Sequence, residues 1–183
     1  VFYPASLPVH AVKRERVHET ARETLKRQSA AVRHCHGDLH LRNAFVEHGR
    51  PILFDCIEFD DFYANTPPLY DLAFLIMDLC ARGLAEHANR ALNAWLMDQP
   101  PPRWHGLLED LAALPAYLTW RAEIRAKTEG RKPGAADAAR RYLRLASDFA
   151  MPGAPILVAI GGLSGAGKST LARALAHTLG RAP

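Results

Sequence analysis

Three polar side chains, Asp38, Asn43 and Asp55, have the types and the spacing that phosphoryl transfer requires. Asp38 and Asn43 stand five positions apart in a polar stretch, and Asp55 ends the apolar run that begins at Pro51. A hydroxyl that attacks a γ-phosphate needs a carboxylate to orient it and accept its proton, which is chemistry that Asp38 has. Mg²⁺ ions that bridge phosphates need hard oxygen ligands, and Asn43 and Asp55 could supply them. The alternative is a polar turn between two strands, without chemistry.

The sequence around these residues resembles that of known phosphotransferases. Residues 36–43 follow H-x-D-x-x-x-x-N, and the strand that ends in Asp55 follows, as in the catalytic loop and metal-binding aspartate of kinases. Gly37 replaces the arginine of protein kinases, and His-Gly-Asp-Leu-His is similar to the motif of aminoglycoside and choline phosphotransferases. Ile57 stands where protein kinases have a glycine, which argues against their type of activation loop. The resemblance implies ATP and Mg²⁺ as cofactors.

The same resemblance implies roles for residues around the loop. Tyr70-Asp71-Leu72-Ala73 matches a second family sequence, whose aspartate would accept hydrogen bonds from the loop backbone and hold it rigid. His36 is also expected to support the loop. An acidic patch that follows Asp55 could hold a cationic substrate or could be a solvated loop, and it consists of Glu58, Asp60 and Asp61.

The spacing of apolar residues predicts the elements that position these side chains. A surface helix is expected from 9 to 31, a short strand from 31 to 35, and a hairpin from 43 to 55 that turns at Gly49. Helical spacing continues from 69 to 98, with a break at Gly83. Two more helices are expected at about 104–128 and 135–149. Leu118, Trp120, Ile124 and Leu143 are expected in the core.

A row of basic residues follows the last two predicted helices: Arg121, Arg125, Lys127, Arg131, Lys132, Arg140, Arg141 and Arg144. Such a row is usually a solvated face, and the alternative is contact with an anionic partner. The net charge of +4 is spread thinly along the 183 residues, which disfavours a nucleic-acid partner.

The order of a hairpin followed by helices is similar to the C-terminal lobe of aminoglycoside phosphotransferase-like kinases. We expect this module over residues 1–150, with the resemblance itself covering about 9–150. No strand with a phosphate-anchoring lysine precedes His36, so the N-terminal lobe of such kinases is expected to be missing from this stretch.

A second phosphate-binding pattern follows a Pro- and Gly-rich linker at 151–155. Residues 162–169 satisfy G-x-x-x-x-G-K-[ST], between a strand expected at 156–160 and a helix expected at 170–179. Its backbone N–H groups would wrap the β-phosphate, Lys168 would reach the β- and γ-phosphates, and Ser169 would bind Mg²⁺. The alternative is a Gly-rich turn. The expected nucleotide-binding residues are Gly162, Ser164, Gly165, Ala166, Gly167, Lys168, Ser169 and Thr170.

The predicted fold class is therefore α+β and mainly helical: a kinase-like C-terminal lobe, then the first βα unit of a truncated P-loop α/β domain over 156–183. This arrangement resembles a bacterial family in which a phosphotransferase-like module is fused to a P-loop kinase of the AAA or zeta-toxin type. The chain is accordingly expected to be a portion of a longer, two-domain protein.

Cysteine content and hydropathy indicate the environment. The odd number of cysteines, three, without a C-x-x-C pair, fits a reducing cytosol, and no apolar run is long enough to span a bilayer. We therefore expect a soluble, cytoplasmic protein of unknown oligomeric state. A zinc site can be imagined from side chains near the loop, although their spacing fits no common pattern: His34, Cys35, His36, His40 and Cys56.

The function predicted from these patterns is ATP-dependent transfer of the γ-phosphoryl group to a hydroxyl of a small molecule, an aminoglycoside or another metabolite. Asp38 would be the base, Asn43 and Asp55 would hold Mg²⁺, and Asp71 would support the loop. Two alternatives remain. The P-loop could be the active site of a small-molecule kinase or NTPase, with the first module regulatory or substrate-binding, or the chain could be a non-catalytic nucleotide-binding module.

Overall fold

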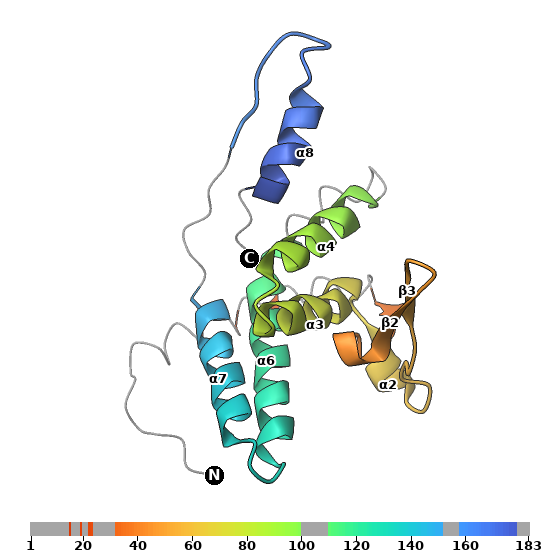
Figure 1. The fold of residues 1–183 in the computed structure, drawn as a ribbon, viewed down its shortest axis with the longest axis vertical. Coiled ribbons are helices and arrows are strands. Elements are labelled where there is room, and N and C mark those ends of the chain that lie inside the picture. The colour runs from red at the N-terminus through yellow and green to blue at the C-terminus, as the bar shows by residue number, and fades with distance from the viewer. Residues whose placement is uncertain are drawn as a thin grey trace.

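Helices make up most of the described chain, and two small antiparallel sheets lie beside them (Figure 1). This computed structural model describes residues 15, 19, 22–23, 32–99, 110–151 and 158–178. Of the helix expected at 9–31, the four described residues, Glu15, Glu19, Arg22 and Glu23, are helical, and the others lie outside the described residues. The mainly helical α+β class predicted from the sequence is confirmed.

Short strands and turns frame the loop that carries Asp38. Strand β1, Arg33–His34, pairs with β4, Asn65–Thr66, and β2, Ala44–Glu47, pairs with β3, Arg50–Leu53. The hairpin turns at His48 and Gly49, which have φ angles of 49° and 76°, so its predicted position is confirmed. The 3-10 turn η2, Leu41–Asn43, leads into β2, and helix α2, Asp61–Ala64, begins after the capping carboxylate of Asp60.

The helical part begins with α3, Pro68–Ala81, and α4, Ala85–Met97. Gly83 lies between them with a φ of 76°, which confirms the predicted break, because a left-handed residue ends a helix and glycine adopts it at low cost. Helices α6, Leu114–Gly130, and α7, Ala136–Phe149, run side by side, and α3 lies across α6 (Figure 1).

The core is formed where α3, α6 and α7 meet. Ile76 and Met77 of α3 and Tyr117 and Leu118 of α6 are fully buried. The small side chains Ala122, Ala126 and Ala146 let α6 and α7 approach closely. Trp120 is only partly buried and packs against this core.

Two residues expected in the core lie elsewhere. Ile124 is 43% exposed and Leu143 is 44% exposed. On α6 the buried row runs through Leu118, Ala122 and Ala126 at intervals of four, and Ile124 points away from that row. The expectation was therefore wrong for Ile124 and Leu143, because the apolar spacing did not fix which face of each helix meets its neighbour.

The basic row also divides in two. Lys127, Arg131, Lys132, Arg140, Arg141 and Arg144 are exposed, as expected of a solvated face. Arg121 is buried, and the side chain of Arg125 is only 12% exposed. For these two residues the prediction of a solvated face was wrong, because both extend from the side of α6 that covers the loop around Gly37.

The P-loop-like segment has less regular structure than expected. Residues 156 and 157 lie outside the described residues, and residues 158–160 form no strand, so the predicted βα unit is not confirmed. Helix α8, Lys168–Thr178, does follow the loop, and it lies beyond α4 (Figure 1).

Two further expectations concern thiols and membranes. Cys35, Cys56 and Cys80 are free thiols, and burial raises the pKa of Cys80 to about 11. Among the residues described, the helices are too short or too polar to cross a membrane.

Candidate active site

One amide group brings together the three residues selected from the sequence. The Nδ2 of Asn43 donates hydrogen bonds to the backbone oxygen of Asp38 at 3.0 Å and to its carboxylate Oδ2 at 3.1 Å. It also lies 3.4 Å from the backbone oxygen of Asp55. Asn43 is buried, at the end of η2, so this arrangement fixes the Asp38 side chain relative to the strand end that carries Asp55.

His40 holds the other side of the Asp38 carboxylate. Its Nδ1 accepts a hydrogen bond from the backbone N–H of Arg42, so the ring proton of the neutral histidine is on Nε2. That atom lies 3.4 Å from Asp38 Oδ2. Hydrogen bonds from His40 and then Asn43 lower the pKa of Asp38, although partial burial opposes them. Asp38 is therefore an oriented, ionised carboxylate at neutral pH.

Asp71 lies beneath the loop, in the first turn of α3. Its Oδ2 accepts the backbone N–H of His36 and its Oδ1 accepts that of Gly37, each at 3.0 Å. Gly37 has a φ of 79°, and this turn points both N–H groups at one carboxylate. Burial raises the pKa of Asp71, while Arg121 and the two N–H groups favour its charged form.

Arg121 of α6 closes the same network from the opposite side. Its Nη2 donates to the backbone oxygen of Gly37 at 3.2 Å and lies 3.9 Å from Asp71 Oδ1. The guanidinium also stacks on the rings of Tyr70, at 4.0 Å, and Phe74, at 4.5 Å. No local sequence pattern predicts this contact, because 84 positions separate Arg121 from Gly37.

A second carboxylate of α3 supports the far end of the loop. Asp78 Oδ2 accepts the backbone N–H of Leu41 at 3.1 Å and a hydrogen bond from Arg82 Nε at 3.2 Å. Asp78 stands seven positions after Asp71, so both carboxylates lie on one face of the helix. The sequence analysis missed Asp78, and that seven-residue spacing is the signal that could have found it.

His36 ties the loop to the segment that follows β3. Its Nε2 donates to the backbone oxygen of Phe54 at 2.9 Å, and its backbone oxygen accepts the N–H of Ile57 at 2.9 Å. Because the carbonyl of Phe54 can only accept, His36 carries its proton on Nε2. Phe54 directly precedes Asp55 in sequence, so this contact fixes the path of the chain next to Asp55.

The remaining oxygen atoms of Asn43 and Asp55 fit Mg²⁺. The three acceptors around Asn43 Nδ2 fix the amide orientation, and no described residue hydrogen-bonds its Oδ1. No described residue pairs with the exposed carboxylate of Asp55, whose backbone has a φ of 59°. Mg²⁺ commonly takes one or two protein oxygens and completes its shell with water and phosphate. The described residues contain no cluster of three or more His, Cys, Asp or Glu side chains suited to a metal.

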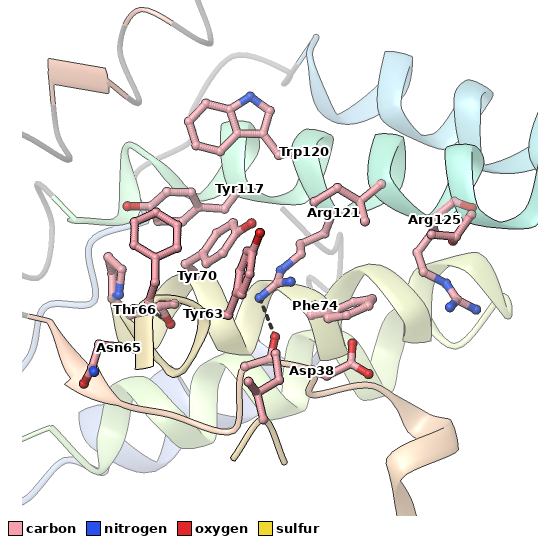
Figure 2. Close-up of a pocket in the computed structure, with 16 residues that line it drawn as sticks. Asp38, Tyr63, Asn65, Thr66, Tyr70, Phe74, Tyr117, Trp120, Arg121 and Arg125 are labelled. Atoms are coloured by element: carbon pink, nitrogen blue, oxygen red, sulfur yellow. Dashed lines mark hydrogen bonds between the residues drawn. The ribbon is translucent and has the colours of Figure 1, made fainter. Parts of the chain in front are cut away.

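A cavity of about 600 Å³ opens beside Asp38. Several aromatic side chains line its wall, and Arg121 and Arg125 of the same helix line it as well (Figure 2). This volume is in the range of pockets for small molecules. Asp38 therefore lies at the edge of a space that could hold an acceptor.

Comparison with known proteins supplies the family. Residues 4–109 match the model of the phosphotransferase enzyme family. The chain belongs to this family. Over 154 residues it is 34% identical to uncharacterized protein Mb2027c of Mycobacterium bovis and to uncharacterized protein Rv2004c of Mycobacterium tuberculosis. The alignment covers 79% of this chain and 29% of each relative, so the chain spans less than a third of their length. No solved structure matches.

The family match covers one part of the candidate site. It includes the loop around Asp38, the strand end at Asp55 and the carboxylate of Asp71, and it ends at residue 109. Helix α6, which begins at Leu114, supplies Arg121, Arg125 and much of the cavity wall. The part of the cavity wall that α6 supplies therefore lies outside the family match.

The acidic patch predicted to bind substrate lies outside the cavity wall. The carboxylate of Asp60 accepts the backbone N–H of Phe62 and caps α2, while Glu58 and Asp61 are exposed. A role in holding a cationic substrate stays a prediction.

The P-loop-like segment has backbone features of a phosphate-binding loop. Gly162, Gly165 and Gly167 have φ angles of 152°, 77° and 76°. Lys168 begins α8, and its Nζ donates to the backbone oxygen of Leu163 across the loop. The side chains of Ser164, Ser169 and Thr170 are exposed. Their predicted nucleotide and Mg²⁺ contacts stay predictions.

Proposed function

We propose that this chain carries the transfer site of an ATP-dependent phosphotransferase that moves the γ-phosphoryl group to a hydroxyl of a small molecule. The observation that carries the proposal is the Asp38 carboxylate, which His40 and Asn43 hold at the edge of a cavity. A general base must be fixed and ionised before its substrate arrives, and both conditions are met here.

Each residue has a defined task in this reaction. Asp38 orients the acceptor hydroxyl and takes its proton as the oxygen forms a bond to the γ-phosphorus and the bond to the leaving ADP oxygen breaks. Asn43 and Asp55 would hold Mg²⁺, which would neutralise charge on the phosphates. Asp71, Asp78 and Arg121 keep the loop in place. Because the loop is fixed at both ends, Asp38 needs little reorganisation during transfer.

The substitution Asp38→Asn tests this function, because it preserves size and hydrogen bonding but removes the base. We expect phosphate transfer from ATP by the whole protein, assayed over a panel of hydroxyl compounds, to fall about 10²- to 10⁴-fold in kcat. The far-UV circular dichroism should not change. Asp148→Asn, an exposed carboxylate on α7, is the matched control and should retain full activity. Normal transfer by the Asp38→Asn variant would refute the proposal.

A second candidate is phosphotransfer or NTP hydrolysis at the P-loop-like segment, and the left-handed glycines before α8 support it. In that case Lys168→Ala abolishes turnover and Asp38→Ala spares it. A non-catalytic nucleotide-binding module is the third possibility, and any transfer that disappears with Asp38→Asn excludes it.

A further inference from the structure

We propose that the cavity beside Asp38 binds an acceptor with an aromatic body and an acidic group, whose hydroxyl lies at Asp38 and whose anion pairs with Arg125. The inference rests on the proposed function and names the substrate class for the same site. It differs from a polycationic acceptor such as an aminoglycoside.

The shape and surface of the cavity favour a flat, apolar body. Tyr63, Tyr70, Phe74 and Trp120 line it together with Ile124 (Figure 2). Aromatic walls gain most from stacking on another ring and from excluding water. A volume of about 600 Å³ is ample for one substituted ring.

The charges on the wall favour an anion at the end away from Asp38. Asp38 is the one acidic residue among the described residues that line the cavity, and Arg121 and Arg125 are the basic ones. Arg121 and Arg125 are four residues apart, which is about 6 Å along the helix. Since Arg121 contacts the backbone next to Asp38, Arg125 lies about one ring's length further along the wall.

The guanidinium of Arg125 keeps capacity for a ligand. Its Nη2 donates to Glu129 Oε1 at 3.0 Å, but its buried Nε has no hydrogen-bond partner among the described residues. The same holds for the buried Nε of Arg121, whose side chain is 8% exposed. Buried donors usually have partners, so these two guanidinium groups are less fully paired by the protein than is usual.

Glu129 does not cancel this positive charge. Its carboxylate faces three cations, with Lys132 Nζ at 2.9 Å, Arg125 at 3.0 Å and Arg42 at 3.7 Å. One negative charge among three positive ones leaves a surplus, and hydrogen bonds from Lys132 lower the pKa of Glu129. An incoming carboxylate or phosphate would therefore meet a positive field around Arg125.

The test compares three ligands of one shape by calorimetry on the whole protein: 4-hydroxyphenylacetate, its neutral amide and tyramine. We expect the anion to bind at least about tenfold tighter than the amide, and the cation to bind most weakly, because a charge-assisted hydrogen bond is worth more than a neutral one. Arg125→Gln should reduce the affinity for the anion to that for the amide. Arg140→Gln, an exposed arginine of α7 outside the cavity, should change nothing.

Thr128→Glu provides a variant that keeps both arginines. Thr128 is exposed on α6 and lines the cavity, so a carboxylate there should not disturb the core. It should weaken binding of the anion and strengthen binding of tyramine. The proposal is overturned if the wild-type protein binds the anion and the amide equally, prefers tyramine or binds none of the three. It is also overturned if a folded Arg125→Gln protein keeps the preference for the anion.

The two proposals can fail separately. Preference for the anion that persists while Asp38→Asn transfers phosphate normally would leave the cavity assignment standing and refute the role of Asp38. Loss of transfer in Asp38→Asn without any preference for the anion would support the role of Asp38 and refute the cavity assignment.

Discussion

Gly37 lets the loop adopt a left-handed backbone conformation and lets Ile57 pack closely against it. Its backbone has a φ of 79°, and a Cβ at this position would lie 2.9 Å from the Cδ1 of Ile57. Ile57 can pack there because Gly37 has no side chain. The two departures from the protein-kinase pattern, glycine before Asp38 and isoleucine after Asp55, are therefore coupled in space.

Replacing Gly37 by Ala should destabilise the fold through two effects that a control can separate. Left-handed backbone costs alanine about 1–2 kcal/mol, and contact with Ile57 adds about 1–3 kcal/mol. Gly49→Ala should show the first effect alone, because Gly49 has a φ of 76° and open space around it. Urea unfolding measures the free energy of each variant.

The double variant Gly37→Ala with Ile57→Ala provides the check on that interpretation. The coupling energy should be favourable, because the smaller side chain relieves the contact while each site alone is destabilised. Equal losses for Gly37→Ala and Gly49→Ala would show that backbone conformation accounts for the whole effect.

At this scale the sequence predicted which candidate residues lie together, but not which other residues hold them in place. Asp38, Asn43 and Asp55 stand in one short stretch, so their spacing was informative. Arg121 reaches the loop from a helix 84 positions away, and its burial depends on how α6 crosses α3. A basic side chain on a helix is predicted to be solvated unless the packing of that helix against its neighbours is known.

Helix α3 is the element that sets the geometry of the loop. Its carboxylates at Asp71 and Asp78 accept backbone N–H groups from both ends of the loop, and its aromatic residues Tyr70 and Phe74 stack on Arg121. Polar groups of the loop are thereby satisfied by one rigid helix rather than by the loop itself. The position of the first part of the loop should therefore depend on the charged carboxylate of Asp71, which accepts two of these N–H groups.

Asp71→Asn should loosen the first part of the loop. An amide keeps one acceptor and turns an NH₂ group towards the other backbone N–H, so one hydrogen bond is lost at a cost of about 1–3 kcal/mol. The amide protons of His36 and Gly37 should then exchange faster, and kcat should fall more than KM changes. Hydrogen exchange measured by NMR and steady-state kinetics give both results.

Asp78→Asn is the control on the same helix. Both of its hydrogen bonds use one oxygen, which an asparagine can retain, so exchange at His36 and Gly37 should stay as in the wild-type protein. If Asp71→Asn leaves these two amides as protected as before, Asp71 does not position the loop.

The positions of the helices were easier to predict than which side of each helix is buried. Gly83 ended α3 and Gly49 turned the hairpin where expected, because a left-handed φ is a local property. Ile124 and Leu143 were misplaced because helical spacing defines a stripe but not the neighbour that it meets. Strand β4 was not predicted, since two residues carry no detectable alternation.

At the scale of the whole molecule, the chain divides into a packed helical part and a weakly packed P-loop-like segment. Tyr117, Leu118 and Thr119 of α6 are fully buried, whereas Leu163 is 85% exposed and Leu171 of α8 is 51% exposed. Exposed apolar side chains contribute little to the stability of a helix, so the two parts should differ in how often they open.

Hydrogen exchange of this 183-residue chain should reveal this division. Amides of α8 should exchange at least about 100-fold faster than those of α6, because local opening free energies range from near zero to the global value. Mg-ATP should slow exchange at α8 if the loop at 162–167 binds phosphate, and Lys168→Ala should remove that protection. Asp55→Asn should remove protection only around residues 36–43. Amides of α8 as slow as those of α6 without nucleotide would show that the segment packs as part of the same core.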